Sequence, residues 1–158
     1  MKTTQSFHRL IRIVPFLMAL IATVGVIGCA ALGFGPKYGS IKNDIAPVSA
    51  EKGRIVFYRV FDEFPMWKYP IFLDGKKVGT GYGSSIFYLD VDPGKHLVII
   101  PSIFFPGVTD QGITISKNET IYVRSHLPPG WKPIAELVSS EQALAEIDEL
   151  EFLADPNR

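Results

Sequence analysis

The fold is decided between residues 71 and 78, which read Ile71-Phe72-Leu73-Asp74-Gly75-Lys76-Lys77-Val78. Two short apolar segments flank the dipeptide Asp74-Gly75. This dipeptide is typical of a two-residue β-hairpin turn, because both of its positions must tolerate a positive φ. The stretch therefore predicts two antiparallel strands and sets the expectation of a β-rich chain.

Strand signals continue on both sides of this hairpin. Residues 54–61 are rich in β-branched and aromatic side chains and are apolar on both faces, which indicates a strand covered on both sides. Residues 86–91 alternate in polarity and lead into a turn at Asp92-Pro93-Gly94, where proline and glycine preset the backbone. We expect residues 96–100 to return as the partner strand.

The C-terminal part predicts further strands and then a helix. A third hairpin, two strands around a polar turn, is predicted over residues 112–125, and residues 133–138 read as the last strand. Ser139 and Gln142 then match a capping box at the start of a helix. The apolar side chains that recur at helical spacing are Ala143, Leu144, Ile147 and Leu150. We expect a short amphipathic helix that packs on the sheet or covers its edge.

Composition agrees with one folded domain. Of 158 residues, 47% are hydrophobic and 20% are charged, which suits one core of ordinary size. No helical period interrupts the strands, so a parallel βαβ architecture is not expected. We predict a mainly β protein, an antiparallel β-sandwich over residues 53–153 that includes one C-terminal amphipathic helix, with a short tail over residues 154–158.

Charge and cysteine content exclude several classes of protein. The chain carries 16 basic and 16 acidic side chains, so its formal net charge is zero. This balance excludes the basic surface expected of a nucleic-acid-binding protein. A single cysteine excludes an intrachain disulfide framework and a multi-cysteine metal cluster.

The N-terminal part has the pattern of an export signal. Residues 1–12 hold basic side chains and no acid, and residues 13–27 form an apolar run of 15 residues. Val26-Ile27-Gly28-Cys29 stands where this run gives way to small residues. The tetrapeptide resembles the lipobox of bacterial lipoproteins, in which the cysteine thiol receives a diacylglyceryl group and a peptidase cuts just before it. We therefore predict a signal peptide over residues 1–28 and lipidation at Cys29.

One alternative to this interpretation stays open. The uncharged run over residues 13–35 is long enough to span a bilayer, so it could remain as an uncleaved anchor. Cys29 would then be a small hydrophobe within that helix. Both interpretations carry the bulk of the chain across a membrane.

Residues 29–52 are predicted to be a lipidated tether. They are rich in glycine, proline and serine and show little periodicity. A flexible chain of about 22 residues has a root-mean-square reach of about 25 Å. Two or more acyl chains give stable attachment to a membrane. Ala30, in place of an aspartate, is similar to lipoproteins sorted to the outer membrane, so we expect the periplasmic face of that membrane.

Four segments together resemble one family. They are Gly53–Arg59, Phe72–Gly79, Phe87–His96 and Ile121–Arg124. In these segments the chain resembles the small bacterial lipoproteins of the domain of unknown function 2846 family, whose turns are similar to those of PEGA-like β-domains. The resemblance implies a PEGA-like or transthyretin-like sandwich and implies no settled enzymatic activity.

Candidate catalytic groups are few. His96 follows a turn and His126 ends a predicted strand, and each is more typical of a turn or a sheet edge than of a metal ligand. A small periplasmic hydrolase built on either histidine is the alternative function. Residues 79–85 are glycine-rich but lack the lysine of a P-loop and lead into a strand, which indicates a flexible connection or bulges. We predict that the chain is not an enzyme and uses no cofactor or metal.

Large apolar side chains gather in three predicted loops, over residues 64–69, 103–106 and 127–131. Either these loops fold back and plug the ends of the sandwich, or they form an exposed patch for a partner. The candidate interaction residues are Trp67, Tyr69, Phe104, Phe105 and Trp131. The sequence thus predicts a non-catalytic, lipid-anchored envelope module. It would be bound to a membrane through acyl chains on Cys29, with an envelope protein or a glycan, and not nucleic acid, as its partner.

Overall fold

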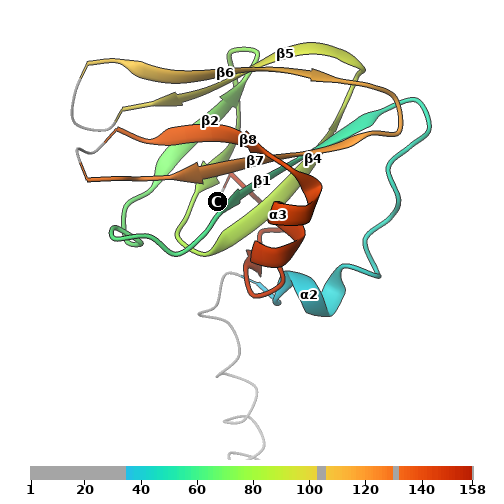
Figure 1. Ribbon diagram of the computed structural model, residues 1–158, viewed down its shortest axis with the longest axis horizontal. Coiled ribbons are helices and arrows are strands. Elements are labelled where there is room, and N and C mark those ends of the chain that lie inside the picture. Colours follow the sequence, from blue (N-terminus) through green and yellow to red (C-terminus); the bar gives the residue numbers. More distant parts are fainter. Residues whose placement is uncertain (1–34, 103–105, 130–131, 158) are drawn as a thin grey trace, which may run out of the picture. The chain divides into compact units, whose positions relative to one another are not determined.

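Two β-sheets lie face to face in the computed structural model, which describes residues 35–102, 106–129 and 132–157 (Figure 1). One sheet has the strand order β8-β7-β1-β4-β9 and the other has the order β3-β2-β5-β6. The strands are β1 (Gly53–Arg59), β2 (Tyr69–Leu73), β3 (Lys76–Gly81), β4 (Ser85–Val91), β5 (Gly94–Pro101), β6 (Val108–Ile115), β7 (Thr120–His126), β8 (Ile134–Val138) and β9 (Glu151–Phe152). The described helices are α2 (Tyr38–Ile41) and α3 (Ser140–Glu146). The predicted mainly β sandwich is confirmed.

β1 is the central strand of the five-stranded sheet, and it is covered on both faces as its composition predicts. Ile55 and Phe57 belong to the main core between the two sheets. Val56 and Tyr58 point the opposite way and join a second, smaller core with Ile147, which follows α3. All residues of β1 are buried, because α3 covers the outer face of this sheet (Figure 1).

The hairpin predicted at Asp74-Gly75 is confirmed. β2 and β3 pair antiparallel around this dipeptide, with φ angles of 51° at Asp74 and 80° at Gly75. The register shifts between Ile71 and Phe72, which places a β-bulge in the pair. The glycine-rich residues that follow are not a flexible connection: Gly79 belongs to β3, and a side chain at that position would collide with the ring of Phe87.

The other two predicted hairpins are wrong. β4 and β5 follow each other across the turn at Asp92-Pro93-Gly94, but they belong to different sheets. The same holds for β6 and β7. Instead, β5 pairs with β6, and β7 pairs with β8. β1 pairs antiparallel with β4 and parallel with β7, so the five-stranded sheet is mixed rather than purely antiparallel.

The turn between β6 and β7 shows why the pairing differs. The backbone amide of Asn118 donates a hydrogen bond to the carbonyl of Lys52, and the amide of Arg54 donates to the carbonyl of Glu119. These two bonds hold the turn beside the start of β1. The strand that leaves the turn therefore runs alongside β1 in the same direction. Turn residues predicted a change of direction here, but not the sheet that the next strand joins.

α3 begins where the sequence predicts. The side chain of Ser139 accepts a hydrogen bond from the backbone amide of Gln142, as a helix N-cap does. The buried residues of the predicted apolar face are Ala143, Ile147 and Leu150. Leu144 is 53% exposed, so its assignment to that face is wrong. Residue 144 is rotated by about 100° from residue 143 around the helix, and this turns it away from the sheet.

The described part of the predicted tether lies on the domain instead of extending freely. Lys37 forms a β-bridge with Glu151, and the guanidinium of Arg54 donates a hydrogen bond to the carbonyl of Ala46 at 2.8 Å. The tether hypothesis therefore needs correction at residues 36–42, Ala46 and Lys52, because hydrogen bonds join these residues to the folded domain. Among the residues that the structure describes, neither helix has the length and apolar character needed to cross a bilayer.

Candidate interaction site

The loop between β1 and β2, residues 60–68, is held by a buried arginine. Arg59 is the last residue of β1, and its side chain is fully buried. Its guanidinium donates two hydrogen bonds to the carboxylate of Asp62, at 2.8 and 2.7 Å. It also donates to the backbone carbonyls of Phe64 and Trp67. A bidentate ion pair and two backbone contacts therefore fix the loop from below.

Asp62 connects this loop to the loop that follows β7. Its carboxylate accepts hydrogen bonds from the backbone amides of Phe64 at 3.0 Å and Leu127 at 3.1 Å. Burial opposes ionisation of the carboxyl group, but the hydrogen bonds from Arg59 and from the two amides hold the pKa of Asp62 below its ordinary value. A charged carboxylate is thus stabilised beneath both loops.

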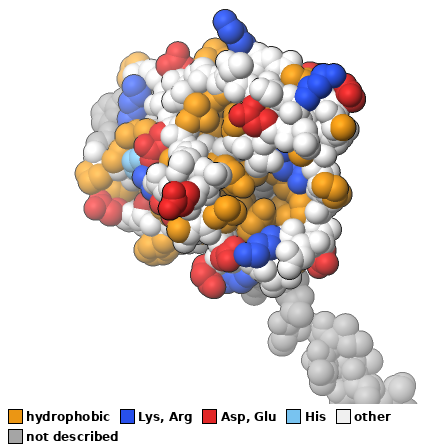
Figure 2. Space-filling view, turned by 45° about the vertical axis from the view of Figure 1, so that its right-hand side comes forward, with side chains coloured by type: hydrophobic (Ala, Val, Ile, Leu, Met, Phe, Trp, Pro, Cys, Tyr) orange, Lys and Arg blue, Asp and Glu red, His pale blue; other side chains and the backbone are white. Residues whose placement is uncertain are grey.

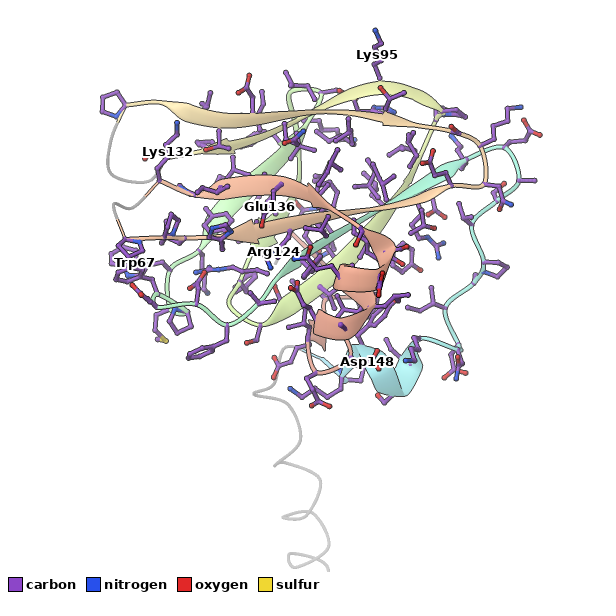
Figure 3. The ribbon with its side chains drawn as sticks, viewed as in Figure 1. Trp67, Lys95, Arg124, Lys132, Glu136 and Asp148 are labelled. Carbon is purple, nitrogen blue, oxygen red and sulfur yellow. The ribbon has the colours of Figure 1, made fainter. Side chains whose placement is uncertain are left out.

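The same loop presents large apolar side chains to solvent. The exposed fraction is 87% for Met66, 73% for Phe61 and 38% for Trp67. Figure 3 shows Trp67 at one end of the sandwich, the end at which Lys132 also lies. Hydrophobic side chains are also exposed on the face that Figure 2 draws, but these three stand on one loop, and exposed apolar groups that gather in one place mark interaction sites. We call Phe61, Met66 and Trp67 the loop surface.

The structure separates the predicted interaction residues. Trp67 is exposed, whereas Tyr69 is fully buried, so the prediction that Tyr69 contributes to a surface is wrong. Tyr69 is the first residue of β2 and points inward, where its ring centre lies 4.9 Å from the guanidinium carbon of Arg59. Burial raises the pKa of the Tyr69 phenol to about 12. Phe104, Phe105, Trp131 and the predicted lipidation site Cys29 lie outside the described residues.

The two interpretations of the aromatic loops apply to different residues. Leu127, in the loop after β7, is 1% exposed and belongs to the main core. Phe64 is partly buried against the same core. These two side chains plug the end of the sandwich, while Met66 projects from it. Within the β1–β2 loop, Phe64 therefore fills the core while Met66, two positions later, is exposed to solvent.

His96 links two turns of the protein. Its Nδ1 lies 2.7 Å from a carboxylate oxygen of Asp74, and its Nε2 lies 2.8 Å from the carbonyl oxygen of Asp92. The other carboxylate oxygen of Asp74 accepts a hydrogen bond from the amide of Leu97. The hydrogen bond with Asp74 raises the pKa of His96 above its ordinary value of 6.5. Both ring nitrogens are thus engaged in joining the β2–β3 turn to the β4–β5 connection.

His126 lies elsewhere, on β7 of the five-stranded sheet, whereas His96 is on β5 of the other sheet. The Nδ1 of His126 is 4.0 Å from a carboxylate oxygen of Glu136. Within the described ranges, no group of three or more histidine, cysteine, aspartate and glutamate side chains is placed to hold a metal ion. His96 and His126, the two candidate catalytic residues, are therefore not brought together in one metal site of this kind.

A polar cluster beneath α3 was not predicted from the sequence. The guanidinium of Arg124 donates to Glu136 at 2.7 Å and to Glu146 at 2.8 Å, and the hydroxyl of Tyr58 donates to Glu146 at 2.7 Å. Figure 3 shows Arg124 and Glu136 close together on neighbouring strands. Burial and the bond to Glu146 raise the pKa of Tyr58. The alternation of residues along β7 indicates that the side chain of Arg124 points out of the sheet. It does not indicate that this side chain binds a glutamate of α3.

The loop surface is therefore the described feature that most resembles a binding site, and the remaining polar groups link elements of the fold. A scan against protein-family models gives no match for this chain, and a search of curated proteins gives no significant match.

Proposed function

We propose that this protein is a non-catalytic, lipid-anchored envelope lipoprotein that binds a partner through its loop surface. The observation that carries the proposal is the contrast within residues 60–68. Phe61, Met66 and Trp67 are exposed to water, while buried Arg59 fixes the backbone that carries them. A binding loop that is already ordered loses little conformational entropy when its partner arrives. Tryptophan is also among the residues that contribute most to binding at interfaces.

The anchoring part of the proposal rests on Val26-Ile27-Gly28-Cys29 and on its place after the apolar run. The resemblance to the small lipoprotein family supports it, since that family implies the sandwich fold seen here. The outer membrane, facing the periplasm, is the location that Ala30 favours. A protein or glycan of the envelope is the expected partner of the loop surface.

Crosslinking in intact cells tests the interaction. A photo-reactive amino acid at Met66 should form one discrete adduct with an envelope component, and Trp67→Ser in the same chain should abolish it. The same photo-reactive residue at Lys95 is the matched control, because Lys95 projects from the top of the domain in Figure 3, away from Trp67 at its left end. Identical adducts from both positions, or adducts from neither, would contradict the proposal.

Lipidation at Cys29 has its own test. Cells that express the full chain should incorporate labelled fatty acid into the protein, and Cys29→Ser should reduce that incorporation to background, since the thiol is the predicted acceptor. The variant should also keep its signal segment and migrate as a larger species in denaturing electrophoresis. Ala30→Ser is the control and should leave labelling unchanged. Label that persists in Cys29→Ser, or that is absent from both proteins, rules out the lipid anchor.

A further inference from the structure

Residues 36–42, which we call the clamp segment, are bonded to the C-terminal end of the domain. Three backbone hydrogen bonds join them, from the Tyr38 amide to the Leu150 carbonyl at 2.8 Å, from the Gly39 amide to the Asp148 carbonyl at 2.9 Å, and from the Phe152 amide to the Pro36 carbonyl at 2.9 Å. Figure 1 shows α2, the helical turn of this segment, beside the chain that leaves α3. The segment is therefore docked through bonds of the kind that join elements of one fold.

Two glycines allow this close approach. A side chain at Gly35 would collide with the backbone carbonyl oxygen of Phe152. A side chain at Gly39 would lie 3.0 Å from the carbonyl oxygen of Asp148. Glycine is the residue that lets two backbones meet at such distances. The glycine content that predicts a flexible tether is thus explained by docking at these positions.

The attachment is mostly exposed, and the apolar contact that α2 makes with the smaller core comes from the partly buried ring of Tyr38, so the segment can open without unfolding the sandwich. α2 is a single turn with no buried residue. The ion pair between Lys42 and Asp148 spans 2.9 Å, but its two side chains are 40% and 48% exposed. Exposed ion pairs contribute little to stability, and they are weakened by salt. Segments with few buried apolar contacts open locally at low free-energy cost.

We propose that the clamp segment can detach from the domain, and that its docking sets how far the domain reaches from its membrane anchor. The proposal rests on lipidation of Cys29, as proposed above. When the segment is docked, Gly35 stands six positions after Cys29, a chain of at most about 22 Å. When the clamp segment detaches, Ala46 is still held by Arg54, and it stands 17 positions after Cys29, a chain of at most about 61 Å. The same protein thus has a retracted and an extended form.

Energy transfer on vesicles tests the reach. The lipidated full chain, with Lys95→Cys as its one labelled thiol, is placed in vesicles of phosphatidylethanolamine and phosphatidylglycerol that carry an acceptor on a headgroup lipid. Gly35→Val and Gly39→Val should each lower the transfer efficiency about twofold or more relative to the wild type, because the freed chain lets the domain move away. Gly112→Val is the matched control, since a side chain there meets no atom within 4 Å.

Hydrogen exchange separates docking from folding and from lipidation. In the full chain in detergent, the amides of Tyr38 and Gly39 should be protected in the wild type and in Gly112→Val. They should exchange at least about tenfold faster in Gly35→Val, while amides of β1 keep their protection. The exchange measurement does not require lipidation, so it would still test docking if Cys29 proved not to be lipidated. Unprotected Tyr38 and Gly39 amides in the wild type, or equal energy transfer in all variants, would overturn the clamp.

Discussion

Replacing Arg59 with methionine is expected to lower the free energy of unfolding by about 3–5 kcal/mol, the cost typical of removing one partner from a buried ion pair. The side chain of Arg59 is 0% exposed and that of Asp62 is 11% exposed. The variant leaves the Asp62 carboxylate and the loop carbonyls without their donor in a site that water reaches poorly. Urea denaturation followed by tryptophan fluorescence measures the loss.

Arg54→Met is the matched control for this prediction. Arg54 also comes from β1 and pairs with an aspartate, Asp90, but that partner is 32% exposed. Solvent can replace part of the lost interaction there, so the destabilisation should be smaller than in Arg59→Met. Equal losses in the two variants would show that burial of the Arg59 pair has no special role in stability.

The pH dependence of the same pair has a definite sign. The pKa of Asp62 is lowered in the folded protein, so its contribution to stability is present above the ordinary value of 3.8 and is lost as the pH falls through the lowered pKa. The difference in unfolding free energy between wild type and Arg59→Met should therefore shrink in strong acid. A difference that grows as the pH falls would contradict the assigned ion pair.

Phe57→Ala is expected to cost about 3–5 kcal/mol of unfolding free energy, as the loss of a buried phenylalanine from a core does. Phe57 is 1% exposed, and its ring centre lies 5.1 Å from that of Phe87 in a stacked pair. Phe57 is on β1, the central strand of its sheet, and its side chain belongs to the core between the two sheets. Neighbouring side chains cannot easily fill the cavity that the substitution would leave. Thermal and urea unfolding measure the effect.

Phe72→Ala provides the comparison for Phe57→Ala. Phe72 is on β2 and partly buried, and it alternates with core residues that face the other sheet. Because part of its ring already meets water, we expect a loss of about 1 kcal/mol. A larger loss for Phe72→Ala than for Phe57→Ala would mean that the main core does not lie where the structure places it.

Local chemistry predicted the elements of this fold better than their partners. Asp74-Gly75 determines its own hairpin, because two residues with positive φ leave the chain one way to return. The turn at Asp92-Pro93-Gly94 also reverses the chain, but it carries β4 into a strand of the other sheet. The sheet that a strand joins depends on which strands share a core. β1, for example, pairs with β4 and β7, which come much later in the sequence. No turn signal contains this information.

The site was only partly predictable for a related reason. The sequence predicts Trp67 as an interaction residue, because a large apolar side chain is unusual in a loop. Arg59 was missed because an arginine at a strand end usually faces solvent. Its carboxylate partner is three residues away, but its backbone partners depend on the path of the loop. Tyr69 was assigned to the loop and is instead the inward first residue of β2, a shift of one or two positions at an element boundary.

The parallel pairing of β1 with β7 has a consequence for how the chain matures. Arg54 lies opposite Thr120 in this register, so the central strand of the sheet is incomplete until the last third of the chain is present. Closing so long a loop is slow, and folds dominated by such distant pairs form slowly. A newly made chain would therefore remain unfolded while its C-terminal third is still being synthesised or threaded. That delay is compatible with the export that we propose, in which the chain crosses a membrane as an unfolded polypeptide before it folds.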